Sequence, residues 1–599
     1  MVTASISDYG FLSDCQTAAL VHRHVSVDWY CPLRFDSQAV FSPLLDPDGG
    51  HWSIRPVGDF IAERAYIEDT MVLRTVFETS TGRIALLDTL AMGHTERGHH
   101  IGRQVPHVLV RQVEGLAGVV EVVIEFVPRP EYGLTIPYFE ATAWGVMAHG
   151  GAVGFNLLVN GAQLTVEPGR AVGELHVRSG DIAGFGLRCY RYSARETNLL
   201  PETVDARAEL ENAVEAWQSW TELHHGYRGP YTEQVRRSAL VLQGLTFQPT
   251  GAVIAAATTS LPETRGGSDN WDYRYSWLRD LSLTLRALWV AACPDEVVRF
   301  FDWVSHATRN QLENLQIMYG VEGERDLTEH TLDHLDGFNG ATPVRVGNDA
   351  WDQKQLDVYG EIVDAIYLLR DQLSNPLDDQ IRQLVLTFAN RAAQRWREPD
   401  AGMWEARDQQ RHYLTSKVMC WVALDRAIKL APRLGDDAQV EEWEQTRDEI
   451  REAVHRHGWS EEVQAFTGAF GSHHLDASVL LMPLVGFLPA SDSRMRSTIA
   501  RIGRELVDNG LVHRWAGDEH GFLICTYWFV ECLALAGEID RSIELFEQTT
   551  AYANDLGLLA EEVDPRTGEL MGNFPQTLSH VGLINAAWRV GEVQRRQTP

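Results

Sequence analysis

The sequence predicts two domains, an N-terminal antiparallel β-sandwich followed by an all-α (α/α)6 barrel. Two observations predict them. Up to about residue 205, short alternating or β-branched runs recur between glycines and prolines at the spacing of sandwich strands. From Tyr231 onward the hydrophobic period becomes that of helices, and strongly apolar helices alternate with charged ones. The predicted division is residues 1–205 for the sandwich, 206–230 for a connecting helix and 231–599 for the barrel.

The sandwich prediction depends on runs such as MVLRTVFET, GRIALLDTL, VVEVVIEFVP and AVGFNLLVN. Alternation of apolar and polar residues is typical of strands with one buried face. The glycines and prolines between the runs indicate turns. The stretch ETVDARAELENAVEAWQSWTELH that follows is amphipathic with a helical period, and we interpret it as a connecting helix.

The barrel prediction depends on twelve candidate helices, of which six are apolar on nearly every side. These six are LSLTLRALWVAA, EIVDAIYLL, KVMCWVALDRAI, DASVLLMPLVGF, FLICTYWFVECLALAG and HVGLINAAW. A helix that is apolar all round is buried, whereas a helix with one apolar stripe lies outside. An inner ring of six helices within an outer ring of six satisfies this alternation with short connections. A plain helical bundle or a solenoid is the alternative.

The composition of the 599 residues is that of an ordinary globular protein, with 44% hydrophobic residues and a formal net charge of −31. This charge argues against nucleic acid and anionic membranes as partners. The N-terminus shows no secretory signal pattern, and no apolar run is long enough to span a membrane. The seven cysteines are scattered without a CxxC pair. We therefore expect a cytoplasmic protein.

Each of the six apolar helices follows a loop dense in aromatic and polar residues. In an alternating barrel the inner helices all run the same way, so these loops should converge on one mouth. Aromatic faces stack on the C–H surfaces of sugars, and paired polar groups fix sugar hydroxyls. The loops are GGSDNWDYRYSWLRD, ATPVRVGNDAWDQKQLDVYG, AGMWEARDQQRHYLTSK, FTGAFGSHHLD, LVHRWAGDEHGF and LLAEEVDPRTGELMGNFPQTLSH.

Three positions in these loops supply candidate carboxylates. In WLRD, Asp280 could accept two sugar hydroxyls while Arg279 keeps it ionised, although a structural ion pair at a helix start is the alternative. Glu405 directly follows Trp404, whose indole would desolvate the carboxyl and favour its protonated form, as a general acid requires. The alternative is a buried but inert glutamate.

The second carboxylate that glycoside hydrolysis requires is Glu561 or Glu562. The nearby histidines lack the spacing of metal ligands, so neither a metal nor another cofactor is expected at this mouth. These histidines are His412, His473, His474 and His580.

The chain resembles the bacterial members of the glucoamylase and trehalase family, glycoside hydrolase family 15, over almost its full length. Its opening, ISDYGFLSDCQTAALVHRHVSVDWYCPLRFDSQAVFSPLL, resembles the start of the N-terminal sandwich of that family. The barrel motifs are carried by NWDYRYSWLRD, PVRVGNDAWDQKQLDVYGE, GMWEARDQQRHYLTSKVMCWVALDRA and NDLGLLAEEVDPRTGELMGNFPQTLSHVGLINAA.

This resemblance implies inverting hydrolysis of terminal α-linked glucose, with Glu405 as general acid and Glu561 as general base. It also implies a set of substrate-binding residues: Trp277, Arg279 and Asp280 around the non-reducing glucose, Trp404 as an aromatic wall, and Arg514 of VHRW. One departure concerns the loop after this arginine, which is only AGDEHG here and is often longer and glycine-rich in relatives. This puts the leaving-group preference in doubt.

The expected function is therefore an inverting, exo-acting α-glucoside hydrolase that releases glucose from trehalose or short α-glucans. Trehalose is the slight favourite, with His412, His520 and Arg514 as candidates to contact its second glucose. The alternatives are a glucoamylase-type hydrolase of maltose or isomaltose oligosaccharides, a disaccharide phosphorylase of similar architecture, and an inactive carbohydrate-binding protein. The expected partner is a small carbohydrate, with no nucleic acid and no membrane, and a homo-oligomer is an open alternative.

Overall fold

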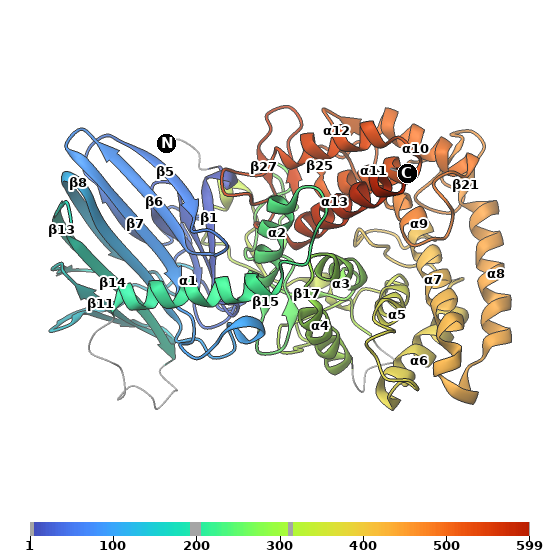
Figure 1. Cartoon of the computed structure of the whole chain (residues 1–599), viewed down its shortest axis with the longest axis horizontal. Helices are drawn as coiled ribbons and strands as arrows, with labels where there is room; N and C mark the ends of the chain where they lie inside the picture. Colours follow the sequence, from blue (N-terminus) through green and yellow to red (C-terminus); the bar gives the residue numbers. More distant parts are fainter. Residues whose placement is uncertain (1–4, 192–204, 309–314, 598–599) are drawn as a thin grey trace.

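A computed structural model describes residues 5–191, 205–308 and 315–597. The long strands occupy one end of the molecule and most of the helices the other, so the predicted order of a sandwich and then a barrel is confirmed (Figure 1). Residues 192–204, at the end of the predicted sandwich region, lie outside the described residues. The domain boundaries at 205/206 and 230/231 stay predictions.

The sandwich consists of two antiparallel sheets that share one long strand, β8 (Val108–Val127). The N-terminal half of β8 pairs with β7 and β14, and its C-terminal half pairs with β4 and β13. Gly118 lies where the partners change and has a φ of +65°. A side chain there would meet the carbonyl oxygen of Thr81 at 2.2 Å, so the crossing requires glycine.

The strands of the two sheets are as follows. Beside β8, the first sheet contains β1 (Tyr9–Ser13), β2 (Ala18–His22), β3 (Ser26–Cys31), β4 (His51–Pro56), β12 (Thr165–Glu167) and β13 (Arg170–Arg178). The second contains β5 (Phe60–Tyr66), β6 (Leu73–Thr79), β7 (Gly82–Leu90), β9 (Tyr138–Thr142), β10 (Gly145–Gly150), β11 (Val153–Asn160) and β14 (Ile182–Arg191).

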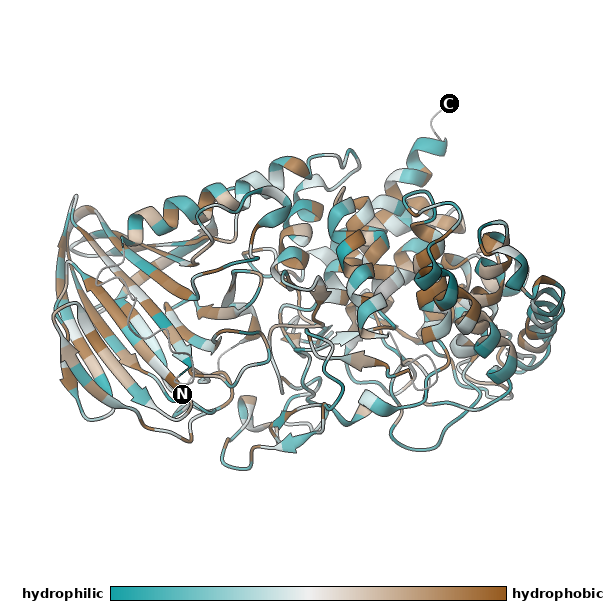
Figure 2. Cartoon of the chain, turned by 90° about the horizontal axis from the view of Figure 1, so that it is seen from below, coloured by the Kyte–Doolittle hydropathy of each residue, from teal (hydrophilic) through white to brown (hydrophobic). Residues whose placement is uncertain are grey.

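The alternation in the sequence is what buries one face of each strand. In the second half of β8 the side chains of Val120, Val122, Ile124 and Phe126 are buried, whereas the residues between them are more exposed. Figure 2 shows the same alternation of hydrophobic and hydrophilic residues along the sheet strands.

The connecting helix is α1 (Ala206–Leu223), which packs on β7, β8 and β14 along the sandwich (Figure 1). Its first turn is capped by Asp205, which accepts a hydrogen bond from the Ala208 backbone N–H. Its apolar stripe includes Trp217 and Trp220, both buried. The helix therefore carries the chain across the sandwich toward the barrel.

The six apolar helices form the predicted inner ring within the described residues. They contact each other in the cyclic order α3, α5, α7, α9, α11, α13 and back to α3, which closes the barrel and excludes a solenoid. The inner helices are α3 (Leu281–Val290), α5 (Val358–Leu368), α7 (Leu414–Leu430), α9 (Leu481–Leu484), α11 (Leu523–Leu535) and α13 (Thr577–Gln597). The outer helices are α2 (Thr232–Gly244), α4 (Pro294–Ala307), α6 (Asp379–Arg395), α8 (Val440–His457), α10 (Ser493–Glu505) and α12 (Ile539–Thr550).

The fourth inner helix is much shorter than the run DASVLLMPLVGF predicts. Its first turn is the 3₁₀ helix η7 (Ala477–Leu480), and only Leu481–Leu484 is α-helical. Pro483 lacks a backbone N–H, and Gly486 has a φ of +77°, which ends the helix. The segment is nevertheless buried, so its apolar composition reports burial correctly and helix length incorrectly.

Two-residue strands tie the loops at the helix ends together, and the sequence does not predict them. They are β15 (Thr246–Phe247), β16 (Ala252–Val253), β17 (Ser276–Trp277), β18 (Met318–Tyr319), β19 (His330–Thr331), β20 (Arg345–Val346), β21 (Trp459–Ser460), β22 (Ala465–Phe466), β23 (Val507–Asp508), β24 (Leu511–Val512), β25 (Gly521–Phe522), β26 (Glu562–Val563) and β27 (Leu570–Met571).

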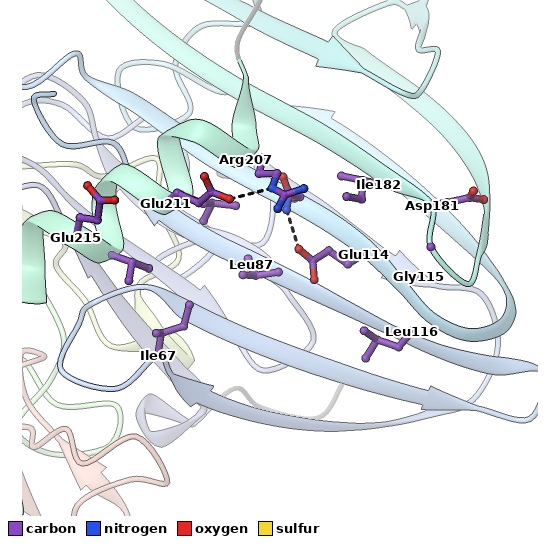
Figure 3. Close-up of a pocket in the computed structure, with 14 residues that line it drawn as sticks. Ile67, Leu87, Glu114, Gly115, Leu116, Asp181, Ile182, Arg207, Glu211 and Glu215 are labelled. Atoms are coloured by element: carbon purple, nitrogen blue, oxygen red, sulfur yellow. Dashed lines mark hydrogen bonds and ion pairs between the residues drawn. The ribbon is translucent and has the colours of Figure 1, made fainter.

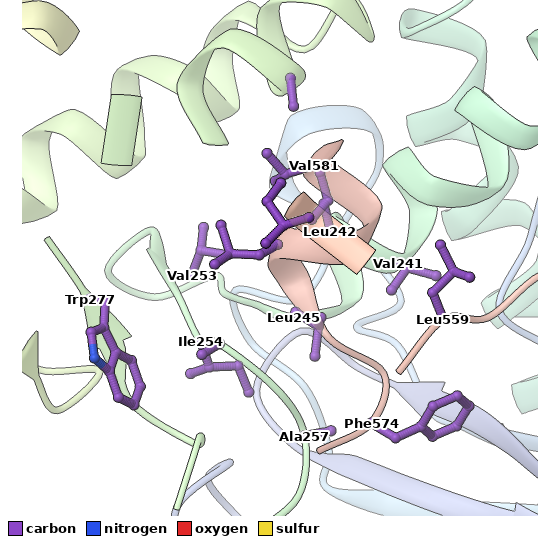
Figure 4. Packing of buried hydrophobic residues seen from close by; sticks show 14 of the residues in the cluster. Val241, Leu242, Leu245, Val253, Ile254, Ala257, Trp277, Leu559, Phe574 and Val581 are labelled. Carbon is purple, nitrogen blue, oxygen red and sulfur yellow. The ribbon is translucent and has the colours of Figure 1, made fainter. Parts of the chain in front are cut away.

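Where the first and last barrel helices meet, buried residues from distant segments pack together (Figure 4). Val241 and Leu242 of α2 lie in the same core as Leu559, Phe574 and Val581. This packing fixes the loop that carries Glu561. None of the helices in the described ranges is long and apolar enough to cross a membrane.

Candidate active site

A cavity of about 340 Å³ opens among the loops at one end of the barrel. All seven predicted site residues line it: Trp277, Arg279, Asp280, Trp404, Glu405, Arg514 and Glu561. The inner end of the cavity, its floor, is buried, and the outer end, its mouth, is exposed. Asp280 and Glu561 are only 8% and 3% exposed, whereas Trp515 of the same lining is 37% exposed. A ligand here would therefore be enclosed at its inner end and open to solvent at its outer end.

Glu405 is held from one side by two donors. The indole N–H of Trp277 donates to its Oε1 at 2.7 Å, and Nη1 of Arg279 donates to the same oxygen at 2.9 Å. Among the described residues no hydrogen bond reaches Oε2, so that oxygen can face a ligand. The backbone of Glu405 has a φ of +58°, which is strained for a residue other than glycine. Such strain persists where the surroundings impose a conformation, as active sites do.

Asp280 is the N-cap residue of α3, but its side chain makes no capping hydrogen bond. Its carboxylate instead pairs with Nε of Arg279 at 3.1 Å and lines the cavity. Burial raises the pKa of Asp280 above its ordinary value, although the charge of Arg279 works in the opposite direction. The expected ion pair is therefore present, but burial outweighs its effect on the Asp280 pKa.

Glu561 lines the same cavity from the loop that leads into β26. Its Oε1 accepts a hydrogen bond from the hydroxyl of Tyr273 at 2.8 Å. A side chain at Gly572 would lie 2.9 Å from Oε2 of Glu561, so this glycine makes room for the carboxyl. Burial and the neighbouring charge of Glu263 raise the pKa of Glu561 well above its ordinary value.

The two adjacent glutamates point in different directions, because successive side chains of an extended segment alternate. Glu561 lines the cavity, whereas Glu562 does not. Oε1 of Glu562 lies 3.1 Å from Nη2 of Arg514, outside hydrogen-bond geometry. Arg514 also donates to Glu263 at 2.7 Å and to Asp518 at 2.9 Å. A single guanidinium in the cavity wall therefore compensates three carboxylates.

Trp404 contributes an aromatic wall, but it does not touch Glu405 through its N–H. Its indole N–H donates to Asp476 at 3.0 Å, and its ring lies edge-on to Trp515 and Phe522. The hypothesis that Trp404 provides the environment of the Glu405 carboxyl is thus incomplete. The indole in contact with this carboxyl is that of Trp277.

The six loops meet at this end of the barrel, as predicted, but they do not contribute equally. Four of them supply lining side chains, whereas the second and fourth contact those side chains from behind. From the second loop, Asn348 accepts a hydrogen bond from Arg407, and from the fourth, Asp476 holds Trp404. The second and fourth loops therefore orient the side chains of the others.

Of the three residues predicted to contact a second sugar, only Arg514 lines the cavity. His412 lies beside Phe470 at a distance of 6.2 Å between ring centroids, and buried His520 contacts the Glu263 carbonyl. Both interactions are structural, and loop order alone could not show this. The guanidinium of Arg407 instead lies over the Trp271 ring, 3.9 Å from its centroid, and both residues line the outer part of the cavity.

A larger cavity of about 580 Å³ lies between α1 and the sandwich strands (Figure 3). None of its lining residues is aromatic, and its single arginine, Arg207, is paired with Glu211 at 2.9 Å. It lacks the stacking surfaces and the convergent polar groups of a sugar site. The chemistry therefore belongs to the smaller cavity in the barrel.

Comparison with known proteins agrees with this geometry. Residues 229–588 match the profile of glycosyl hydrolases family 15, and residues 2–207 match the trehalase-like N-terminal domain. The chain belongs to glycosyl hydrolase family 15. It is a glycoside hydrolase, and the resemblance inferred from its motifs is confirmed.

Relatives in this family extend over the whole chain. A trehalase of Mycobacterium tuberculosis is 38% identical, and the match covers 98% of this chain and 89% of the relative. A trehalase of Thermoplasma volcanium is 34% identical, with 99% and 94% covered. A bacterial glucoamylase solved with acarbose superimposes with a TM-score of 0.75 at 13% identity, covering 100% of this chain and 97% of that one. The last likeness shows a shared fold.

Sequence reasoning missed three of the polar residues in this family 15 cavity. Tyr273 lies four residues before Trp277 and donates to Glu561, a spacing that the motif NWDYRYSWLRD contains. Glu263 comes from the segment before that motif, and nothing in its local pattern predicts a place beside Glu561. Glu361 is buried in α5, where it accepts a hydrogen bond from Ser282.

Proposed function

We propose that this chain is an inverting, exo-acting α-glucoside hydrolase that releases glucose from trehalose. The observation that carries the proposal is the placement of Glu405 and Glu561 in the lining of one cavity, with no hydrogen bond to Oε2 of Glu405 among the described residues. Glycoside hydrolysis requires two such carboxyl groups on the two sides of the scissile bond. The cavity volume lies near the lower limit of small-molecule sites, as a small sugar requires.

The terminal glucose would occupy the buried floor. There Asp280 accepts hydrogen bonds from sugar hydroxyls, and Arg279 holds Asp280 and Glu405 in fixed relative positions. Trp277 and Trp404 provide faces for the sugar ring. Because one arginine bonds both carboxylates, gripping the glucose and aligning the acid are coupled.

The reaction then needs two proton transfers, one from Glu405 to the leaving oxygen and one from a water molecule to Glu561. Glu405 donates its proton from Oε2 to the glycosidic oxygen as the C1–O bond breaks. Glu561 takes a proton from a water molecule whose oxygen attacks C1 from the opposite face. The hydrogen bond from Tyr273 orients Glu561 toward that water. We expect about 6.5–9.5 Å between the two carboxyl groups, which leaves room for the water.

The configuration of the products tests inversion. Each trehalose molecule contains two α-linked glucoses, of which only one undergoes attack at C1. Inversion therefore releases α- and β-glucose in equal amounts, whereas retention releases only α-glucose. Proton NMR of the first products, recorded before mutarotation, separates the two outcomes. Predominant α-glucose would overturn the assignment of Glu561 as the base.

The choice of trehalose depends on the outer part of the cavity, where Trp271, Arg407 and Trp515 would contact the second glucose. The family 15 relatives named trehalase, which are similar over the full length, favour this substrate. We expect a higher kcat/KM for trehalose than for maltose or isomaltose. A clear preference for either reducing disaccharide would replace the trehalase proposal with the glucoamylase-type alternative.

A phosphorylase is disfavoured by the charge of the cavity. Each of the three arginines that line it already pairs with a carboxylate, so a phosphate dianion would have to compete with these carboxylates for every cation. Glu561 would also have no role in a reaction that needs no activated water. Formation of glucose 1-phosphate in phosphate buffer would decide for the phosphorylase.

The pH dependence should report the raised pKa of Glu561. A general base works only when ionised, so activity falls as the pH drops through that pKa. Because the negative charge of Glu263 helps to raise it, Glu263→Gln should lower the Glu561 pKa and move the acidic limb of kcat/KM to lower pH. The measurement is the pH profile of kcat/KM for trehalose.

A matched control is Glu569→Gln. Glu569 follows β26 in the same loop but pairs with Arg265 at the surface. The acidic limb of kcat/KM in the Glu569→Gln variant should stay at the pH of the wild type. An acidic limb that is unchanged, or moved to higher pH, in Glu263→Gln would contradict the proposed coupling.

We also propose a cytoplasmic location. All seven cysteines are buried and free. A reducing compartment keeps such thiols unpaired.

A further inference from the structure

Outside the cavity, three side chains from different parts of the chain meet where the sandwich joins the barrel. They are His99 in the 3₁₀ helix η2 (Gly98–His100), His224 at the end of α1, and Glu296 in α4. We call these three residues the junction cluster. One potential ligand atom from each lies within 4.8 Å of the others. None of the three lines the barrel cavity, so the family 15 reaction does not account for them.

The tautomer of His224 leaves a lone pair facing Glu296. Nδ1 of His224 lies 2.6 Å from the carbonyl oxygen of Trp220, so Nδ1 carries the proton and donates it there. In the neutral ring Nε2 is then an acceptor. It lies 3.3 Å from Oε2 of Glu296, and both atoms are buried without a hydrogen-bond partner. Two acceptors so placed repel each other unless a positive charge lies between them.

The other oxygen of Glu296 is fully engaged. Oε1 accepts hydrogen bonds from the indole N–H of Trp220 at 3.0 Å and from Arg299 at 2.9 Å, and Nδ1 of His99 lies 3.2 Å away. Oε2, in contrast, is buried and has no hydrogen-bond partner, so it is available to a ligand.

The second histidine also has a suitable outer contact. Nε2 of His99 lies 2.8 Å from the carboxylate of Asp295, which leaves Nδ1 directed at Glu296. Histidines that bind metals characteristically pair their other ring nitrogen with a carboxylate or a backbone carbonyl. His99 pairs its other nitrogen with a carboxylate, and His224 pairs its other nitrogen with a backbone carbonyl.

We propose that the junction cluster binds one divalent transition-metal ion of the Zn²⁺ class through His99, His224 and Glu296. Two imidazoles and one carboxylate suit such an ion better than Mg²⁺ or Ca²⁺, which prefer oxygen ligands. Bonds of about 2.0–2.1 Å would bring any two ligand atoms within about 4.2 Å, so the cluster must contract slightly on binding. His99 is 30% exposed and offers a path for the ion.

The ion would act on the structure rather than on the reaction. It would link the 3₁₀ helix η2, which follows strand β7 of the sandwich, to α1. It would also link both elements to α4, an outer helix of the barrel. The competing interpretation is a protonated His224 that forms a buried ion pair with Glu296. That arrangement needs no metal and shows no affinity for one.

The experiment uses the full chain after removal of metals with a chelator. Titration with Co²⁺ should produce the visible absorption of a bound ion at a stoichiometry near one per chain, and Zn²⁺ should displace it. Zn²⁺ should also raise the Tm by about 2 °C or more. Because outer contacts alone change metal affinity about 10–100-fold, loss of a ligand in His99→Gln or His224→Gln should weaken binding more than about 100-fold.

His94→Gln is the matched control, since His94 lies near α1, is largely exposed and pairs with Glu209. It should bind Co²⁺ like the wild type. His99 is only partly buried, so His99→Gln keeps the test valid even if His224→Gln fails to fold. The proposal is overturned if the wild type shows no saturable Co²⁺ spectrum, or if His99→Gln binds as tightly as the wild type.

Discussion

Glu405→Gln and Glu561→Gln should each lower kcat for trehalose by about 10²–10⁴-fold, which is the usual contribution of general acid or base catalysis. Glutamine keeps the shape of the side chain but cannot transfer the proton. Trp277 and Arg279 still surround position 405, so the fold should be preserved. The measurement is steady-state kinetics, with circular dichroism to verify folding.

A second substrate separates the two roles. The leaving group of α-glucosyl fluoride needs no protonation, so Glu405→Gln should hydrolyse it at a substantial rate, whereas Glu561→Gln should not. Glu562→Gln is the control, since Glu562 lies outside the cavity, and its loss should be smaller than that of Glu561→Gln. Near wild-type turnover of trehalose by either main variant would remove that residue from its role.

Asp280→Asn should lower kcat/KM for trehalose by about 10²–10⁴-fold. A hydrogen bond to a charged group contributes about 1.5–3 kcal/mol, and Asp280 is proposed to accept two. The change also leaves Arg279 without its ion pair at 3.1 Å, so the alignment of Glu405 should suffer as well. Kinetics on trehalose measure the loss.

Asp269→Asn is the matched control for this prediction, because Asp269 lines the same cavity at its exposed end. Its effect should stay below about tenfold. If Asp280→Asn were no worse than Asp269→Asn, the terminal glucose could not occupy the floor of the cavity.

The sequence predicted the architecture because burial alone determines it. Helices without a polar face, such as α11, have to lie inside, and their alternation with charged helices leaves few arrangements other than a double ring. The sequence pattern overestimated the length of α9, because apolar composition says nothing about the missing N–H of Pro483. The site residues could be predicted where one motif contains several of them, as WLRD does.

The remainder of the site depends on contacts between segments far apart in the chain. The hydrogen bond from Trp277 to Glu405 joins residues 128 positions apart, and the one from Tyr273 to Glu561 joins residues 288 apart. No local pattern carries such information. Local alternation does place Glu561 and Glu562 on different sides, but only the fold shows which side is the cavity.

The shared strand β8 has a consequence for how the sandwich tolerates change. A slip of one residue along β8 would move every side chain of that strand to the opposite face in both sheets at once. Val120 and Phe126 would then point outward, and in the first half, where both faces are buried, the buried Arg111 would exchange faces with its apolar neighbours. Insertions and deletions are therefore far less tolerable within β8 than in strands such as β5 or β12, each of which has a single neighbour.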